Sequence, residues 1–195
     1  MIINFTFLRA ASVRVFKYPE FATNQAIARK SFFKAEDARF YWSKSARGVI
    51  CLASTDIDKS GQSYYGSTAL YHASTKGKTA GEVSLIPIAK NGPCYDIAWQ
   101  PNKEAFCVVY GFMPSNATVY SSPKLDVLYN FKEISKNTCL YSPGNTGLLA
   151  LCGFGNLGGK IEVWKIDGQV KVCEFTSPDT THLEWAADGI GSVQK

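Results

Sequence analysis

Between Thr138 and Phe175 the sequence reads TCLYSPGNTGLLALCGFGNLGGKIEVWKIDGQVKVCEF, in which four short apolar or alternating runs are separated by turn residues. The third run, Lys160 to Lys165, alternates between polar and apolar residues, a period of two that is typical of a half-buried β-strand. Glycine, proline and asparagine separate the runs and favour turns. The stretch therefore predicts four antiparallel strands.

The same order of runs recurs along the chain, and each time the first run ends in an aromatic residue that precedes a turn. These aromatic anchors are Trp42, Trp99, Tyr141 and Trp185, which lie 57, 42 and 44 residues apart. The last two spacings match the roughly 40–45-residue period of a four-stranded propeller blade, and the first is longer by about one hairpin loop. The repeat predicts an all-β, WD40-like β-propeller of four-stranded antiparallel blades, incomplete in this chain.

We expect one partial propeller domain over residues 1–195, cut from something larger. It would comprise a partial blade over 1–35 with strands at 12–18 and 26–33, blades at about 36–89, 93–133 and 136–176, and the start of a further blade at 180–195. Because repeats bury their apolar surface against neighbours, we also expect uncovered apolar faces on the first and last sheets.

Two motifs that resemble ligand sites do not have the required context. Gly153–Gly158 matches the GxGxxG pattern of dinucleotide sites, but the residues that follow alternate as a strand, so no helix N-terminus is available for a pyrophosphate. Asp56–Gly61 opens like a calcium-binding loop, but Ser67 stands where a bidentate glutamate is needed. We interpret the first motif as a glycine-rich turn and the second as a hairpin loop.

The chain offers no pattern for catalysis, for a cofactor or for a metal ion. Its six cysteines form no CxxC pair and stand mostly in apolar runs, which favours buried free thiols. His72 and His182 are isolated among aromatic and aliphatic neighbours, and the acidic residues are scattered. We therefore expect a protein that is not an enzyme and has no cofactor. No apolar run approaches the roughly 20 residues that span a bilayer, so we expect no membrane partner.

Basic residues are concentrated near the N-terminus: residues 1–47 hold nine Lys or Arg against three acids, whereas the remainder holds twelve against thirteen. The candidates for RNA or ribosome contact are Arg29, Lys30, Lys34, Arg39, Lys44 and Arg47. They alternate with Phe32, Phe33, Phe40, Tyr41 and Trp42. Such interleaving suits phosphate contact combined with base stacking. Alternatively, the aromatic residues face a blade core and the charges solvate its outer face.

Several segments carry a resemblance to one known family. They are residues 31–35, 53–56 with 63–66, 90–93 leading into 95–96, 106–114 with 117–119, and 153–157 with 161–164. Over about residues 12–189 the chain resembles the eukaryotic translation initiation factor 2A family, and the block from Tyr110 to Pro114 is far more specific than a generic WD repeat.

The resemblance implies a cytoplasmic translation initiation factor that associates with the small ribosomal subunit and delivers initiator methionyl-tRNA without a need for GTP. It also implies initiator tRNA, mRNA and other initiation factors as partners. A generic WD propeller scaffold for protein–protein interaction is the alternative, because one fold hosts many functions.

Overall fold

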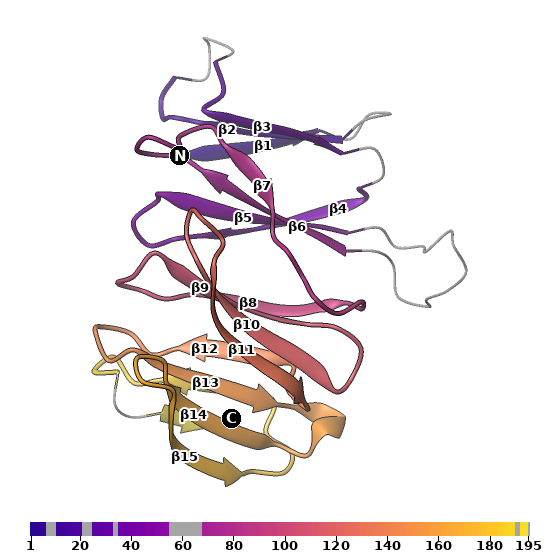
Figure 1. Ribbon diagram of the computed structural model, residues 1–195, viewed down its shortest axis with the longest axis vertical. Coiled ribbons are helices and arrows are strands. Elements are labelled where there is room, and N and C mark those ends of the chain that lie inside the picture. The colour runs from indigo at the N-terminus through magenta and orange to yellow at the C-terminus, as the bar shows by residue number, and fades with distance from the viewer. Residues whose placement is uncertain (7–10, 21–24, 33–34, 55–67, 190–191, 195) are drawn as a thin grey trace. The chain divides into compact units, whose positions relative to one another are not determined.

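The computed structural model describes residues 1–6, 11–20, 25–32, 35–54, 68–189 and 192–194 (Figure 1). The chain forms two compact units, Met1–Pro87 and Ile88–Lys195. Both are built from antiparallel β-sheets, and the helical structure in the described residues is one turn of 3-10 helix, η1, at Gly155–Leu157. The all-β fold class is thereby confirmed. No helix in these described ranges is long and apolar enough to cross a membrane.

The first unit contains a three-stranded sheet and a four-stranded sheet, in which strands adjacent in sequence are also adjacent in the sheet. Their strands are β1 (Ile2–Thr6), β2 (Ala11–Phe16) and β3 (Ala28–Phe32) in the first sheet, and β4 (Asp37–Trp42), β5 (Gly48–Ser54), β6 (Thr68–Ser74) and β7 (Val83–Leu85) in the second. Apolar side chains of both sheets form the core, including Val13 and Val15 of β2 and Val49 and Cys51 of β5.

The second unit contains two four-stranded sheets and a short two-stranded one. Their strands are β8 (Cys94–Trp99), β9 (Ala105–Tyr110), β10 (Ser115–Ser121) and β11 (Val127–Ile134); β12 (Thr138–Tyr141), β13 (Leu148–Gly153), β14 (Lys160–Lys165) and β15 (Val170–Thr176); and β16 (Leu183–Trp185) with β17 (Ser192–Gln194). The division of these sheets into blades of one propeller domain stays a prediction.

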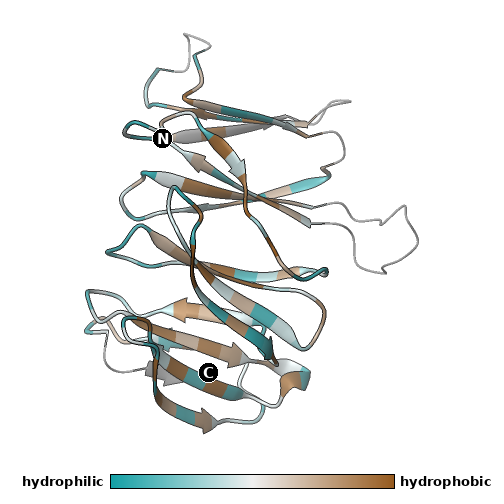
Figure 2. Ribbon diagram, in the orientation of Figure 1, coloured by the Kyte–Doolittle hydropathy of each residue, from teal (hydrophilic) through white to brown (hydrophobic). Residues whose placement is uncertain are grey.

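Burial follows strand order within each four-stranded sheet. All six residues of β9 are buried, whereas Val127 and Leu128 on the outer strand β11 are exposed. Hydropathy follows the same order, since the second strands β5, β9 and β13 are mostly apolar and the outer strands are mixed (Figure 2). Such a central strand is flanked by a strand on each side and covered by packing on both faces of the sheet. Its side chains have almost no access to water, which explains why its sequence is a continuous apolar run.

The six cysteines are all free thiols. Cys51, Cys107, Cys139 and Cys152 are buried within the sheets, and Cys94 is half-buried. Cys173 lies exposed on the outer strand β15. The fold therefore depends on packing and hydrogen bonds, not on disulfides.

The four aromatic anchors share one structural role, which explains their recurrence. Trp42 packs on the core of the first unit. In the second unit the Trp99 ring lies 5.0 Å from Phe106, Tyr141 is part of the core, and Trp185 donates a hydrogen bond from Nε1 to the carbonyl oxygen of Leu140 at 3.2 Å. Each anchor thus fixes the end of a first strand against its neighbours.

The expectation of uncovered apolar faces on the first and last sheets stays a prediction. On β2, Val13 and Val15 point into the core, so Ser12 and Arg14 point away from it and pair across the sheet with Ser31 and Arg29. These four paired side chains are polar, but Phe16, which shares their face of β2, is apolar and buried, and Ser12 is buried as well.

On the last four-stranded sheet part of the apolar surface is covered, whereas Val170 and Val172 of β15 are exposed. Leu183 of β16 is buried against Ala150, Cys152 and Ile161, and Trp185 packs beside it. The chain after β15 thus folds back over the apolar face of that sheet.

Asp96 links the two large sheets of the second unit. Its Oδ2 accepts a hydrogen bond from the Cys139 amide at 2.9 Å, and its Oδ1 accepts one from its own neighbour, the Ile97 amide, at 2.8 Å. Burial raises the pKa of the Asp96 carboxyl, and these two hydrogen bonds offset part of that rise. The carboxylate therefore satisfies a buried amide at the start of β12.

We predict that Asp96→Ala lowers the free energy of unfolding by about 1–3 kcal/mol, because the buried Cys139 amide loses its acceptor. Asp96→Asn is the matched control and should cost less, since one oxygen remains. The pKa of Asp96 is higher in the folded protein than in the unfolded chain. The stability that Asp96 adds relative to Asn is therefore largest at pH values below the unfolded pKa, and it falls as the pH rises through the folded pKa. Urea unfolding between acidic and neutral pH measures both effects; a difference that grows with pH would contradict the assignment.

Candidate nucleic-acid interface

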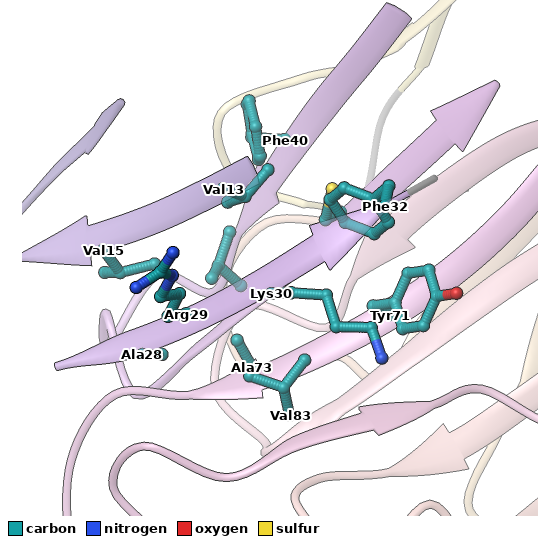
Figure 3. A pocket seen from close by; sticks show the side chains of 12 residues that line it. Val13, Val15, Ala28, Arg29, Lys30, Phe32, Phe40, Tyr71, Ala73 and Val83 are labelled. Carbon is teal, nitrogen blue, oxygen red and sulfur yellow. The ribbon is translucent and has the colours of Figure 1, made fainter. Parts of the chain in front are cut away.

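The structure separates the six candidate residues into groups with different surroundings. Strand β3 carries Arg29 and Lys30 on opposite faces, because successive side chains of a strand alternate. Arg29 is exposed. Lys30 instead lies over the ring of Tyr71, with its Nζ 4.7 Å from the ring centroid (Figure 3). This cation–π contact gives Lys30 a packing role within the first unit.

A small apolar pocket lies beside Lys30, between the two sheets of the first unit (Figure 3). Its lining includes Val15, Phe40, Ala73 and Val83, and its volume is about 20 Å³. That is room for about one water molecule. The pocket is therefore a packing gap and cannot hold a nucleotide base.

Arg39 and Lys34 stand apart from the others. Arg39 lies near the start of β4, where its Nε is 3.5 Å from Oδ2 of Asp37, and both side chains are more than half exposed. Such a surface pair contributes little to stability and leaves the arginine accessible. Lys34 and Phe33 lie outside the described residues.

The aromatic residues between the candidate cations mostly belong to the core. Phe32 is buried and its ring lies 5.1 Å from that of Tyr71. Phe40 and Trp42 are half-buried and pack on the same core. These rings face inward, as the alternative interpretation of the sequence pattern expected, so they are not free to stack on bases.

Lys44 and Arg47 lie exposed in the turn between β4 and β5. The side chain of Ser43 organises this turn, because its Oγ accepts hydrogen bonds from the amides of Arg47 and Gly48, both at 3.1 Å. Ala46 has a φ of 52°, in the left-handed region that tight turns require. The turn is thereby held in one conformation with both cations at the surface.

The turn between β6 and β7 lies against this first turn and adds two cations that the sequence analysis missed, Lys76 and Lys78. The Thr75 amide donates to the carbonyl oxygen of Arg47 at 2.9 Å. Lys76 donates from Nζ to the carbonyl oxygen of Ser45 at 3.2 Å. The expected strand order could have predicted these two lysines. In an antiparallel sheet whose strands follow sequence order, the first and third turns lie at the same end of the sheet.

We call Lys44, Arg47, Lys76 and Lys78 the paired-turn cluster. All four side chains are exposed. Within the described ranges none of them forms an ion pair with a carboxylate. The β6–β7 turn also contains the exposed Glu82, so these four cations and one carboxylate leave a net positive charge at one end of the four-stranded sheet.

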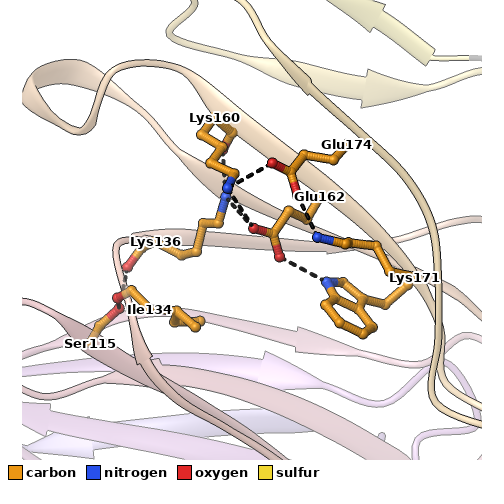
Figure 4. Close-up of polar contacts among 8 residues, drawn as sticks. Ser115, Ile134, Lys136, Lys160, Glu162, Lys171 and Glu174 are labelled. Atoms are coloured by element: carbon orange, nitrogen blue, oxygen red, sulfur yellow. Dashed lines mark hydrogen bonds and ion pairs between the residues drawn. The ribbon is translucent and has the colours of Figure 1, made fainter.

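Several cations of the second unit have carboxylate partners. In the network of Figure 4, the buried Lys136 donates from Nζ to the carbonyl oxygen of Lys160 at 2.8 Å and lies 3.6 Å from Glu162. Lys160 bridges Glu162 at 3.5 Å and Glu174 at 2.7 Å. Burial lowers the pKa of Lys136, whereas the hydrogen bonds from Lys160 and Lys171 lower the pKa of Glu174 to about 2. Each of these three lysines thus has a carboxylate partner, so none of them is left unpaired to bind an external anion.

A polar cavity of about 220 Å³ also lies in the second unit, between the turns that follow β8 and β12. Gln100, Asn102 and Asn145 contribute to its lining. The cation in its lining, Lys103, is paired with Asp167 at 2.5 Å. The cavity is therefore electrically balanced, unlike the paired-turn cluster.

The remaining groups with chemical potential are dispersed. His72 is buried on β6, where burial lowers its pKa to about 4, so it is neutral at pH 7. His182 lies exposed, with Nε2 3.0 Å from Oε1 of Glu184. No group of three metal-binding side chains gathers in the part of the chain that the structure describes.

The two motifs that resemble ligand sites have different outcomes. After the glycine motif the chain continues as strand β14, and Asp56–Gly61 lies outside the described residues.

Repeated four-stranded antiparallel sheets, each started by an aromatic-anchored strand, define a WD40-like propeller repeat protein. Solved propellers support this class: the C-terminal WD40 domain of Sif2 aligns with a TM-score of 0.57 and 11% identity over 95% of this chain and 48% of that one. A family model described as "Eukaryotic translation initiation factor eIF2A" matches residues 30–191, and the chain belongs to this family.

Relatives from distant organisms agree with the family assignment. The chain is 42% identical over 177 residues to eukaryotic translation initiation factor 2A of Drosophila melanogaster, covering 90% of this chain and 27% of the relative. It is 32% identical over 184 residues to the Saccharomyces cerevisiae protein of the same name, covering 93% and 28%. A crystal structure described as that of the eukaryotic initiation factor has a TM-score of 0.75 and 28% identity over 92% of this chain and 40% of that one. The chain thus spans less than a third of the length of these curated relatives.

Proposed function

We propose that this chain is a module of a translation initiation factor, which associates with the small ribosomal subunit and supports GTP-independent delivery of initiator methionyl-tRNA. The observation that carries the proposal is membership of the initiation factor family over residues 30–191. That family is one of translation factors and not of enzymes. The proposed partners are the small subunit, initiator tRNA, mRNA and other initiation factors, in the cytoplasm.

The six basic residues of the N-terminal region are proposed to contribute to RNA or ribosome contact. Lys44 and Arg47 have the strongest support, because they are exposed and have no ion pair in the described part of the chain. Arg29 is also exposed. Lys30 has weaker support, because it packs on Tyr71.

Sedimentation with purified small ribosomal subunits tests the proposed function. We expect the chain to comigrate with the subunits at about 0.1 M salt and to dissociate at about 0.5 M salt, because phosphate contacts weaken as counterions compete. A chain that stays at the top of the gradient at low salt would refute ribosome association.

The alternative function, a scaffold for protein–protein interaction, is favoured by one observation. Phe112 and Met113 lie exposed in the turn between β9 and β10. This turn is fixed, because the Phe112 amide donates to the carbonyl oxygen of Asn91 at 2.9 Å. Affinity capture before and after nuclease treatment separates the two functions: partners that are neither ribosomal proteins nor initiation factors, and that are retained after all RNA is digested, favour the scaffold.

A further inference from the structure

Hydrogen bonds between the two turns fix the backbone of the paired-turn cluster, unlike that of a row of lysines on a flexible segment. The two turns are joined by three hydrogen bonds: from the Thr75 amide to Arg47, from Thr75 Oγ1 to Ala46 at 2.6 Å, and from Lys76 Nζ to Ser45. Each bond ends on a backbone carbonyl oxygen. The backbone positions of the four cations are therefore fixed relative to one another before any ligand binds.

A third segment borders the cluster. A Cβ placed on Gly81, in the β6–β7 turn, would lie 2.8 Å from the carbonyl oxygen of Ile27, just before β3. Val15 and Ala28 pack on Val49 and Ala73, which lie at the same edge of the four-stranded sheet. The exposed Arg29 follows Ala28 directly and therefore lies near this edge of the first unit.

We infer that the paired-turn cluster, Lys44, Arg47, Lys76 and Lys78, is a binding site for the phosphate backbone of RNA. The inference rests on the proposed function, because it names the surface through which the module contacts RNA. The site recognises charge and spacing and not base identity, since the neighbouring Phe40 and Trp42 pack on the core.

A polyanion is the ligand that this chemistry fits. Four exposed cations outnumber the one exposed carboxylate of these turns, Glu82, and a row of phosphates neutralises the excess positive charge while releasing its own counterions. A single metal ion is excluded by the sign of the charge. The fixed turns also lower the entropy cost of ordering lysine and arginine side chains on a ligand.

The test uses a triple variant of the whole chain, Lys44→Gln, Arg47→Gln and Lys78→Gln. Lys76 is kept, because its bond to Ser45 joins the turns. The matched control is Lys124→Gln, Lys132→Gln and Lys165→Gln, which removes the same charge from exposed lysines of the second unit. Equal melting temperatures of the three proteins establish that the fold is intact.

The probe is an RNA hairpin with a stem of about 16 base pairs, the length that one double-stranded RNA-binding domain covers. At 0.1 M salt we expect the cluster variant to bind it about tenfold more weakly for each phosphate that is no longer neutralised. The slope of log K against log salt should become shallower by about one unit for each such phosphate. The control variant should keep the affinity and the slope of the unmodified chain.

Three results would overturn the inference. Equal weakening in the cluster and control variants would show that net charge alone matters, and an unmodified chain that binds no hairpin would remove the site. If the cluster variant no longer binds the small subunit but keeps hairpin binding, the surface contacts ribosomal protein and not RNA. The proposed function is tested separately, by sedimentation of the unmodified chain with small subunits. If the unmodified chain sediments with them, the proposed function stands even when the RNA site is refuted.

Discussion

Replacing Gly159 by alanine is expected to lower the free energy of unfolding of the second unit by about 3–5 kcal/mol. Gly159 has a φ of +69°, and a Cβ there would lie 1.9 Å from the carbonyl oxygen of Ser177 and 2.6 Å from its carbonyl carbon. Both atoms belong to the backbone, and Ser177 donates its amide to the carbonyl oxygen of Gly159 at 3.0 Å. The clash can be relieved only by moving the end of β15 away from the turn before β14.

The neighbouring Gly158 supplies the control. Its φ of +78° is similar, but a Cβ there would meet no atom within 4 Å. Gly158→Ala should therefore cost only the left-handed strain of an alanine, about 1–2 kcal/mol. Urea unfolding followed by tryptophan fluorescence measures both variants. Equal costs at the two positions would show that backbone conformation, and not the contact with Ser177, requires glycine at 159.

Truncating Phe106 to alanine is expected to cost about 3–5 kcal/mol, because a fully buried aromatic side chain leaves a cavity when removed. Phe106 is 0% exposed in β9, between Trp99 at 5.0 Å and Tyr120 at 5.5 Å. Its truncation removes packing from the aromatic anchor of this sheet as well as from β10. Thermal and urea unfolding give the change.

Phe112→Ala is the matched aromatic truncation, since Phe112 is 41% exposed in the next turn. It should change the free energy of unfolding by less than about 1 kcal/mol. A similar cost for Phe106→Ala and Phe112→Ala would contradict the packing described for β9.

The strands were predictable because their signals are local. The runs at 138–141 and 160–165 coincide with β12 and β14, where alternation and turn residues agree. Strand β7 is only three residues long, because Pro87 has no amide to donate and the chain leaves the sheet before it. Strand β1 was not predicted, because its few apolar residues show neither clear alternation nor an anchor.

The candidate site was only half predictable, because it depends on contacts between segments distant in sequence. Charge density along the chain identified Lys44 and Arg47. Lys76 and Lys78 join them only through the pairing of four strands, which composition does not report. Likewise, the pattern around Lys30 gave no sign that this side chain lies on Tyr71, since that contact arises from one sheet packing on another.

The placement of the thiols has a practical consequence for spectroscopy. Burial raises the pKa of Cys51, Cys94 and Cys152 to about 12, and Cys107 and Cys139 are also buried. Because the thiolate is the reactive form and must be reached by the reagent, a maleimide dye at neutral pH should attach at Cys173. Strand β15 thus provides a natural single-site label in the second unit. The fluorescence anisotropy of that dye would report association with a ribosomal subunit without any engineered cysteine.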